Sequence, residues 1–277
     1  WISIGLFSRS AFSCHNFCAF SMDRHFTGAC LDVAITSLDL LSSSQGFVML
    51  IMLSAWCCLI VLMVGVWLYY RITHIPNVVD VAWSIGHWLA GTLYLFAEGI
   101  NTRKLVLWVI LTVWALRLAG YLYWTRLRLK IVDERYIAMQ DEKKMSANLS
   151  FFLNYQLQAC LIMLTVSSLY LSGQAISPSL TIFDWIAIPV ILSGIIMTTL
   201  ADLQLRRFVQ EYKGRVCNRG LWQYSRHPNY FFEWLVWVGF ALSALATPYG
   251  FLSILSPLTL YLIMTKITGP ITERGSL

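Results

Sequence analysis

The chain has 277 residues, of which 58% are hydrophobic and only 12% are charged, and its formal net charge is +6. About a quarter of the residues of a soluble domain are charged, so this composition excludes an ordinary soluble protein and indicates a membrane protein. The positive charge does not indicate nucleic-acid binding. The basic residues lie in two loops between apolar segments, where retention on the cytoplasmic side of a membrane explains them.

The first 46 residues differ from everything that follows. The segment 1–46 is rich in serine, carries no long apolar run and begins with Trp1, whereas Met49 and Met52 stand at the start of the first strongly apolar segment. It is too polar for a secretory signal peptide. We expect it to lie outside the fold, in a chain that is a fragment or includes translated upstream sequence, and we expect the membrane domain to occupy 47–277.

Apolar runs of nearly 20 residues recur from Phe47 onward, and about 20 residues are needed for a helix to cross a bilayer. The runs lack the alternation of a membrane β-barrel, so the sequence predicts an all-α, polytopic helical bundle. Seven spans are predicted. They are approximately 47–70, 79–97, 104–124, 151–171, 181–201, 233–247 and 250–267.

The charged loops predict the orientation of these spans. Two loops, 125–150 and 202–232, carry most of the arginines and lysines, whereas the loop 172–180 has no charge and the loop 98–103 offers only Glu98 and Arg103. Positive residues accumulate on the cytoplasmic side, so both basic loops are expected there, with the N-terminus outside and the C-terminus inside.

The cysteines do not predict a metal site. None of them has metal-ligand spacing, and three fall inside apolar segments, where a thiol behaves as a small hydrophobic group. Cys14 and Cys18 flank His15, but no second pair of ligands follows at a suitable distance. The sequence therefore predicts neither a zinc site nor a disulfide framework.

Polar residues gather where the sixth span begins, in the stretch 218–233. Pro228 suits the first turn of a helix, and Asn229, Glu233 and Trp237 repeat at i, i+4 and i+8, so they share a helix face. Arg226 and His227 stand at the helix N-terminus, where free N–H groups favour an anion, and Tyr230 follows. This pattern favours a site for a phosphate-bearing cofactor. The alternative is a basic belt that contacts lipid phosphates, with Glu233 reaching the membrane surface.

Ionisable residues in three other places are candidates, each with a structural alternative. Asp202 and Arg206 lie one helical turn apart, which suits either an ion pair or the binding of a ribose and a phosphate. Asp80 opens the second span, where either function or simple placement at a helix N-terminus explains it. Arg117 lies deep in the third span and needs a partner, which Asp80 or Asp202 would supply. His87 is expected to be a packed, hydrogen-bonded residue.

The run 133–136 in the first basic loop has mixed charge. Such a run is usually a solvated surface, and the alternative is that Arg135 and Tyr136 close over a nucleotide.

Together these segments resemble the DUF1295 family of membrane proteins, which is similar to the C-terminal domain of steroid 5-alpha-reductases. The resemblance covers about residues 50–277, and its most specific part is 220–233. It implies a membrane reductase that binds NADPH in a cytoplasm-facing cavity. Such an enzyme reduces a carbon–carbon double bond conjugated to a carbonyl, and the resemblance implies a lipidic substrate that enters from the bilayer. Asn229 matches the residue that contacts the nicotinamide, and Glu233 and Asp202 match an acid one turn later and a nucleotide-binding aspartate.

The roles that follow from this resemblance are expectations. Arg226, Arg206 and Arg135 would hold phosphates, with His227, Tyr230 and Tyr136 also lining the cofactor, and Asp80 or Glu233 would supply the catalytic acid. The glutamate and tyrosine that hold the ketone in steroid reductases have no match here, and Trp114 falls where that tyrosine is expected. The chain also ends before the family's usual C-terminal tail.

Two other functions remain open at this stage. One is a membrane methyltransferase of the isoprenylcysteine or phospholipid type that uses S-adenosylmethionine, since such enzymes also have an Arg-His-Pro-like turn before a helix. The arginines of 206–226 favour a dinucleotide over this sulfonium cofactor, which carries no phosphate. The other is a non-enzymatic protein whose basic loops only meet anionic membrane lipids.

Overall fold

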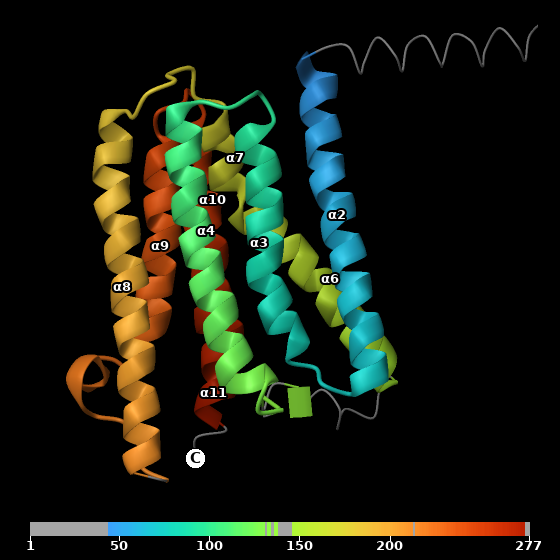
Figure 1. Cartoon of the computed structure of the whole chain (residues 1–277), viewed down its shortest axis with the longest axis vertical. Coiled ribbons are helices and arrows are strands. Elements are labelled where there is room, and N and C mark those ends of the chain that lie inside the picture. The colour runs from blue at the N-terminus through green and yellow to red at the C-terminus, as the bar shows by residue number, and fades with distance from the viewer. Residues whose placement is uncertain (1–43, 131, 134–135, 138–145, 213, 275–277) are drawn as a thin grey trace, which may run out of the picture. The chain divides into compact units, whose positions relative to one another are not determined.

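The structure is a computed structural model that describes residues 44–130, 132–133, 136–137, 146–212 and 214–274 (Figure 1). Most of the segment 1–46 and the candidate Arg135 therefore lie outside the described residues. Residues 48–277 form one compact unit. Every regular element in the described ranges is helical, which confirms the all-α prediction.

The helices follow the predicted spans in order. The bounds are α2 Ser44–Thr73, α3 Val78–Phe96, α4 Thr102–Leu122 with a π-helical extension η1 Tyr123–Leu127, α6 Ala147–Thr165, α7 Ser167–Gly173, α8 Ile182–Glu211, η2 Gly220–Gln223, α9 Pro228–Ala244, η3 Gly250–Ile254, α10 Leu255–Leu262, η4 Ile263–Thr268 and α11 Gly269–Arg274. All seven predicted spans are thus helical. Five helical segments are long and apolar enough to cross a membrane, whereas α3 and α9 are shorter, at 19 and 17 residues.

The helix boundaries differ from the predicted spans at three places. The fourth span is interrupted at Val166, which separates α6 from α7. Helix α8 continues ten residues beyond the predicted end at 201, and α9 begins at Pro228 rather than at 233. The physical reason is that the predicted spans end where apolar residues end. A helix's backbone hydrogen bonds do not need apolar side chains and continue through Asp202, Arg206 and Asn229.

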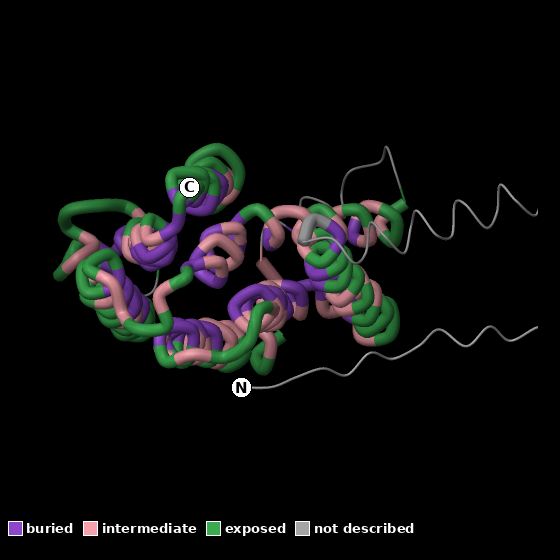
Figure 2. Tube along the Cα trace, turned by 90° about the horizontal axis from the view of Figure 1, so that it is seen from above, coloured by how far each residue is buried: buried purple, intermediate pink, exposed green. Residues whose placement is uncertain are grey.

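Helices α8 and α9 pack closely along their length. A Cβ atom added at Gly194 of α8 would lie 2.9 Å from the carbonyl oxygen of Phe232, and one added at Gly239 of α9 would lie 3.1 Å from the backbone nitrogen of Ile191. Small residues at such an interface let two backbones approach, as is usual in membrane bundles. Buried residues face the neighbouring helices and exposed residues face outward (Figure 2). This contact sets the polar end of α8 beside the start of α9.

The two loops without a basic cluster, 98–103 and 172–180, lie at the end of the bundle where α8 begins, and a buried ion pair joins the helices there. Arg103 Nε donates to Asp184 Oδ2 at 2.7 Å, and both side chains are at most 1% exposed. The other guanidinium nitrogens donate to the carbonyl oxygens of Ser172 and Ser243. Arg103 is therefore not the loop charge that the sequence suggested. It is a buried crosslink between α4, α7, α8 and α9.

Candidate functional site

A buried cluster of one arginine and two carboxylates joins three helices. Arg117 of α4 donates through Nη2 to Asp202 Oδ2 of α8 at 2.5 Å and through Nη1 to Glu233 Oε2 of α9 at 3.2 Å. The side chains of Arg117, Asp202 and Glu233 are 13%, 6% and 12% exposed. We call these three residues the Arg117 cluster. The predicted partner Asp202 is thus confirmed for Arg117, and Glu233 is a second partner.

Two further donors fix the carboxylates of this cluster. Trp114 Nε1 donates to Glu233 Oε1 at 2.6 Å, and Asn229 Nδ2 donates to Asp202 Oδ1 at 3.3 Å. Both oxygens of each carboxylate therefore accept a hydrogen bond. The sequence placed Asn229, Glu233 and Trp237 on one helix face. Glu233 and Trp237 share Trp114 as a neighbour, since the Trp237 ring packs edge-on against it at 5.2 Å, whereas Asn229 contacts Asp202.

The formal charges of the Arg117 cluster do not cancel. One guanidinium faces two carboxylates, and the side chain of Asn229 adds no charge. Charges in a poorly hydrated site interact more strongly than charges in water. The cluster therefore favours a positively charged group, or positive charge that develops during a reaction, at its rim.

Helix α3 supplies the apolar wall behind this cluster. His87 is fully buried, with Nε2 2.6 Å from Thr165 Oγ1 and Nδ1 2.7 Å from the carbonyl oxygen of Trp83. Its ring packs against Trp114 and Trp237. His87 is a packed, hydrogen-bonded residue, as predicted, and it holds in place the tryptophan that contacts Glu233.

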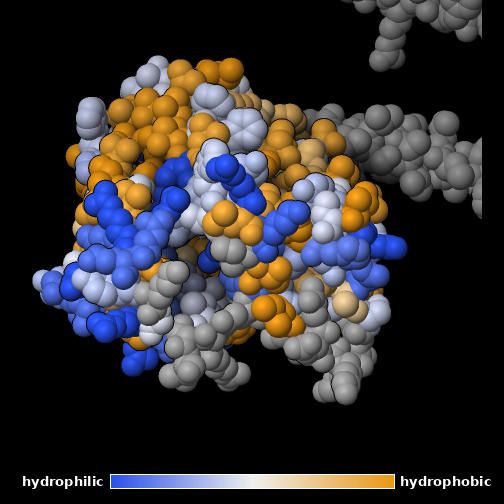
Figure 3. Space-filling view, turned by 60° about the horizontal axis from the view of Figure 1, so that its bottom comes forward, coloured by the Kyte–Doolittle hydropathy of each residue, from blue (hydrophilic) through white to orange (hydrophobic). Residues whose placement is uncertain are grey.

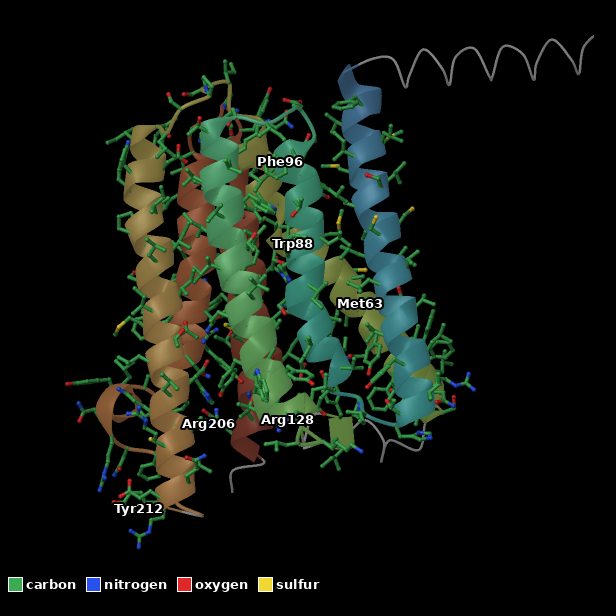
Figure 4. All side chains as sticks on the ribbon, in the orientation of Figure 1. Met63, Trp88, Phe96, Arg128, Arg206 and Tyr212 are labelled. Carbon is green, nitrogen blue, oxygen red and sulfur yellow. The ribbon has the colours of Figure 1, made fainter. Side chains whose placement is uncertain are left out.

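Arginines surround the end of the bundle where α4 and α8 end and α9 begins, which we call the basic end. Arg206 of α8 and Arg128, which follows η1, lie at this end (Figure 4), and hydrophilic residues gather there around a recess (Figure 3). Within the described residues Arg206 forms no ion pair, so of the two alternatives for Asp202 and Arg206 the ion pair is not formed. Asp202 turns inward to Arg117, which leaves the Arg206 guanidinium exposed and available to an anion.

The segment 214–227 is held against α8 by specific contacts. Gly220 adopts a φ of +60°, a conformation that favours glycine, and the end of the Gln204 side chain lies against it. Gln204 Oε1 accepts from the backbone N–H of Leu221, and Trp222 Nε1 donates to the carbonyl oxygen of Ala201. These bonds bring Arg219 and Arg226 to the same end as Arg206.

Asp80 belongs to a separate polar group at the start of α3. Its Oδ1 accepts from the Tyr136 hydroxyl at 2.7 Å, and its Oδ2 lies 3.4 Å from Arg126 Nη1. Arg126 also pairs with Asp133 at 2.8 Å. Asp80 lies in the first turn of α3, as expected for a helix N-terminus, and Tyr136 is 2% exposed. The structure thus joins Asp80 to Tyr136 and does not join it to Arg117.

His227 and Tyr230 lie on another face of α9. Their rings stack at 4.9 Å, and His227 Nε2 lies 3.2 Å from Glu273 Oε1 of α11. Arg226 is 83% exposed and lies 3.5 Å from the same carboxylate. These residues therefore adjoin α11, whereas Asn229 faces α8, so the polar stretch contributes to two surfaces.

Tyr121 is a candidate that the sequence did not single out. It lies one turn after Arg117, whose guanidinium is 5.9 Å from its ring centroid, and it is within electrostatic range of Asp202 and Arg206. Its hydroxyl has no hydrogen-bond partner among the described residues. The signal available in the sequence was its spacing of four residues from Arg117, which places both on one helix face.

The fold and the cluster define a polytopic helical membrane protein with buried charges at the basic end of its bundle. The chain belongs to the DUF1295 family, described as proteins of unknown function, whose sequence profile matches residues 66–277. This finding confirms the family predicted from the motifs. No curated protein and no solved structure matches the chain.

Proposed function

We propose that this protein is an integral membrane reductase that uses NADPH to reduce a carbon–carbon double bond conjugated to a carbonyl in a lipidic substrate. The observation that carries the proposal is the hydrogen bond between Asn229 and Asp202, beside the exposed Arg206, Arg207 and Arg219, which have no carboxylate partner among the residues that the structure describes. The pair comes from two helices, and it sits at the rim of the buried Arg117 cluster. This end of the bundle therefore combines an amide, a carboxylate and exposed guanidinium groups.

The residues present fit the chemical groups of a dinucleotide. Asn229 is partly exposed; its Nδ2 donates to Asp202 and its Oδ1 accepts from the Tyr230 backbone N–H, so one hydrogen and one lone pair remain for a carboxamide. Arg206, Arg207 and Arg219 are exposed at the same end, and guanidinium groups bind phosphates in a bidentate manner. When bound, NADPH would supply the hydride for the reaction.

The chain's own residues would position the reactants and stabilise charge. The excess carboxylate of the Arg117 cluster would stabilise positive charge that develops beside Asn229 as the hydride leaves. The substrate takes up the hydride at the β-carbon and a proton at the α-carbon. Both predicted acids, Asp80 and Glu233, accept hydrogen bonds on both oxygens, so they are better suited to holding donors than to releasing a proton.

Tyr121 is the better-placed proton donor. Its hydroxyl has no hydrogen-bond partner in the described part of the chain, and its ring centroid lies 5.9 Å from the guanidinium carbon of Arg117. Replacement of Tyr121 by phenylalanine is expected to lower the turnover number at least tenfold and to leave NADPH binding unchanged. Tyr123→Phe is the matched control, because Tyr123 lies two residues further on and is 45% exposed.

One observation favours a methyltransferase as the second candidate. The unbalanced carboxylate of the Arg117 cluster would attract a sulfonium group as well as a developing nicotinamide cation. S-adenosylmethionine has no phosphate, however, so this function leaves the exposed arginines at the end of α8 and in the segment 214–227 without a role.

A binding measurement distinguishes the candidates. The detergent-purified protein is titrated with NADPH and with S-adenosylmethionine, and Asn229→Ala is compared with Asn148→Ala, whose exposed side chain lies at the start of α6. The reductase proposal predicts NADPH binding that weakens at least tenfold in Asn229→Ala only. Binding of S-adenosylmethionine alone would contradict it. Failure of both ligands to bind would favour the non-enzymatic alternative, in which the basic loops only contact anionic membrane lipids.

A further inference from the structure

Exposed arginines at the ends of two membrane spans lie over tryptophan rings. The guanidinium carbon of Arg71 is 5.2 Å from the centroid of the Trp67 ring at the end of α2, and that of Arg128 is 4.6 Å from the centroid of the Trp124 ring in η1. In both pairs the arginine follows the tryptophan by four residues, about one helical turn. Helices α2 and η1 end at the same end of the bundle (Figure 1). We call these the two Trp–Arg pairs.

The charges of the two stacked arginines are not neutralised within the described residues. Both side chains are exposed, and in that part of the chain neither forms an ion pair. By contrast, Arg126, two residues before Arg128, pairs with Asp133 at 2.8 Å. A tryptophan side chain has no hydrogen-bond acceptor, so contact with the ring leaves the N–H groups of Arg71 and Arg128 available to an anion.

The rings beneath the arginines are themselves held in place. Trp67 Nε1 donates to the carbonyl oxygen of Asn148 at 3.0 Å, and the Trp67 ring packs edge-on against Phe152 of α6 at 5.2 Å. The Trp124 ring is 53% exposed and packs edge-on against Tyr123 at 5.6 Å. A guanidinium that already rests on a fixed ring loses less conformational freedom when it binds an anion than a free side chain does. The pairs are therefore preorganised for binding.

Both pairs lie where an apolar span gives way to polar residues. Leu68 and Ile72 flank Arg71 and are 50% and 81% exposed. Leu129, directly after Arg128, is 60% exposed. Tryptophan is enriched at membrane–water interfaces, where its ring lies at the level of the lipid headgroups. An anion bound at either pair would therefore have lipid chains beside it.

The reductase proposal leaves the pair on α2 without a role. Helix α2 lies on the opposite side of the bundle from α8, which carries Asp202 (Figure 1), so a dinucleotide held at Asp202 does not explain Arg71. A third ring, that of Tyr212, is contacted by Arg215 and Arg219 at 6.0 and 4.8 Å. It lies farther from the middle of the bundle than Arg128 does (Figure 4), so we do not count it with the two pairs.

From these observations we propose that each Trp–Arg pair binds the phosphate of one anionic phospholipid, whose acyl chains lie along the exposed apolar residues of the same span. Guanidinium groups bind phosphate oxygens in a bidentate manner. A zwitterionic phospholipid would bring its own cation to a site that already holds an unpaired one, and the exposed Lys130 adds a second cation beside Arg128. An anionic headgroup brings none. The two lipid sites stand independently of the reductase proposal.

Native mass spectrometry tests the number and the kind of bound lipids. The full chain, purified in detergent and stripped of lipid, is titrated with dioleoyl phosphatidylglycerol or with dioleoyl phosphatidylcholine. We expect two phosphatidylglycerol molecules, each bound about fivefold more tightly than phosphatidylcholine, which is the contribution of one cation near a membrane surface. Equal binding of the two lipids would overturn the charge preference. Displacement by soluble glycerol phosphate at the same concentration would show a site for a free phosphate and would overturn the lipid assignment.

Matched variants test the location. Arg71→Met and Arg128→Met are each expected to remove one tightly bound phosphatidylglycerol, and the double variant both. Arg207→Met is the control, because Arg207 is exposed on α8 and has no ring contact in the described part of the chain. Trp124→Leu keeps every charge and should weaken one lipid about two- to fivefold, because the ring contact is lost. Two lipids retained by the double variant, an equal loss in the control, or unchanged binding in Trp124→Leu would refute the paired sites.

Discussion

Removal of the Arg117 guanidinium is the sharpest test of the structural account. The residue has three side-chain partners, Thr199, Asp202 and Glu233, on two neighbouring helices. Replacement by methionine keeps an unbranched apolar stem but leaves two carboxylates, 6% and 12% exposed, without their cation. Removing one partner of a buried ion pair costs about 3–5 kcal/mol, because the other charge stays buried and uncompensated.

The corresponding change in melting temperature follows from the size of the chain. About 1 kcal/mol shifts the melting temperature by roughly 2–4 °C in a domain of 150–250 residues, so Arg117→Met is expected to lower it by about 6–20 °C. The 12 tryptophans of the chain make intrinsic fluorescence a suitable readout in detergent. Arg128→Met is the control, since Arg128 is exposed and contacts only the Trp124 ring in the described part of the chain. Its effect should stay below about 1 kcal/mol.

A compensating variant separates charge from packing. When Asp202→Asn and Glu233→Gln accompany Arg117→Met, no buried charge is left, and at least half of the lost stability should return. A single variant that melts within about 2 °C of the unchanged protein would refute the cluster. A triple variant that is less stable than the single variant would also refute the charge-based account of the cluster. That result would mean that the side chains contribute through their shape and not through their charge.

Three further variants test other parts of the structure. Trp114→Phe removes the donor to Glu233 and should destabilise the protein by about 1.5–3 kcal/mol, measured by thermal unfolding, because bonds to charged groups are the stronger ones; an unchanged melting temperature would contradict that bond. Gly194→Leu should separate α8 from α9 and abolish a monodisperse gel-filtration peak, whereas a normal peak would mean that the helices are not closely packed. Asp184→Ala leaves the Arg103 guanidinium buried without its carboxylate and should cost about 3–5 kcal/mol, and recovery in the double variant with Arg103→Met would confirm the pair.

The sequence correctly predicted features that depend on the geometry of a single helix. The i, i+4 spacing of Asn229 and Glu233 correctly placed both on one face, because 3.6 residues per turn is a local property. Pro228 correctly marked the first turn of α9. The same local reasoning left two alternatives open for Asp202 and Arg206. Their spacing permits an ion pair, but the carboxylate of Asp202 pairs with Arg117 of α4 instead.

The sequence could not predict contacts between helices. Glu233 and Trp114 are 119 residues apart, and nothing local connects Arg103 with Asp184. Hydropathy also set the ends of the spans wrongly in α8 and α9, since it measures side chains whereas the helix is defined by backbone hydrogen bonds.

The sequence by itself determined that this is a helical membrane protein with its charge at one end, because apolar length and loop charge follow from composition along the chain. Its motifs also determined the DUF1295 family. Only the tertiary structure decided which acid meets which base. A buried guanidinium must find carboxylates wherever the packing of α4, α8 and α9 brings them, and the close approach of α8 to α9 at their glycines brings Asp202 and Glu233 to the same arginine.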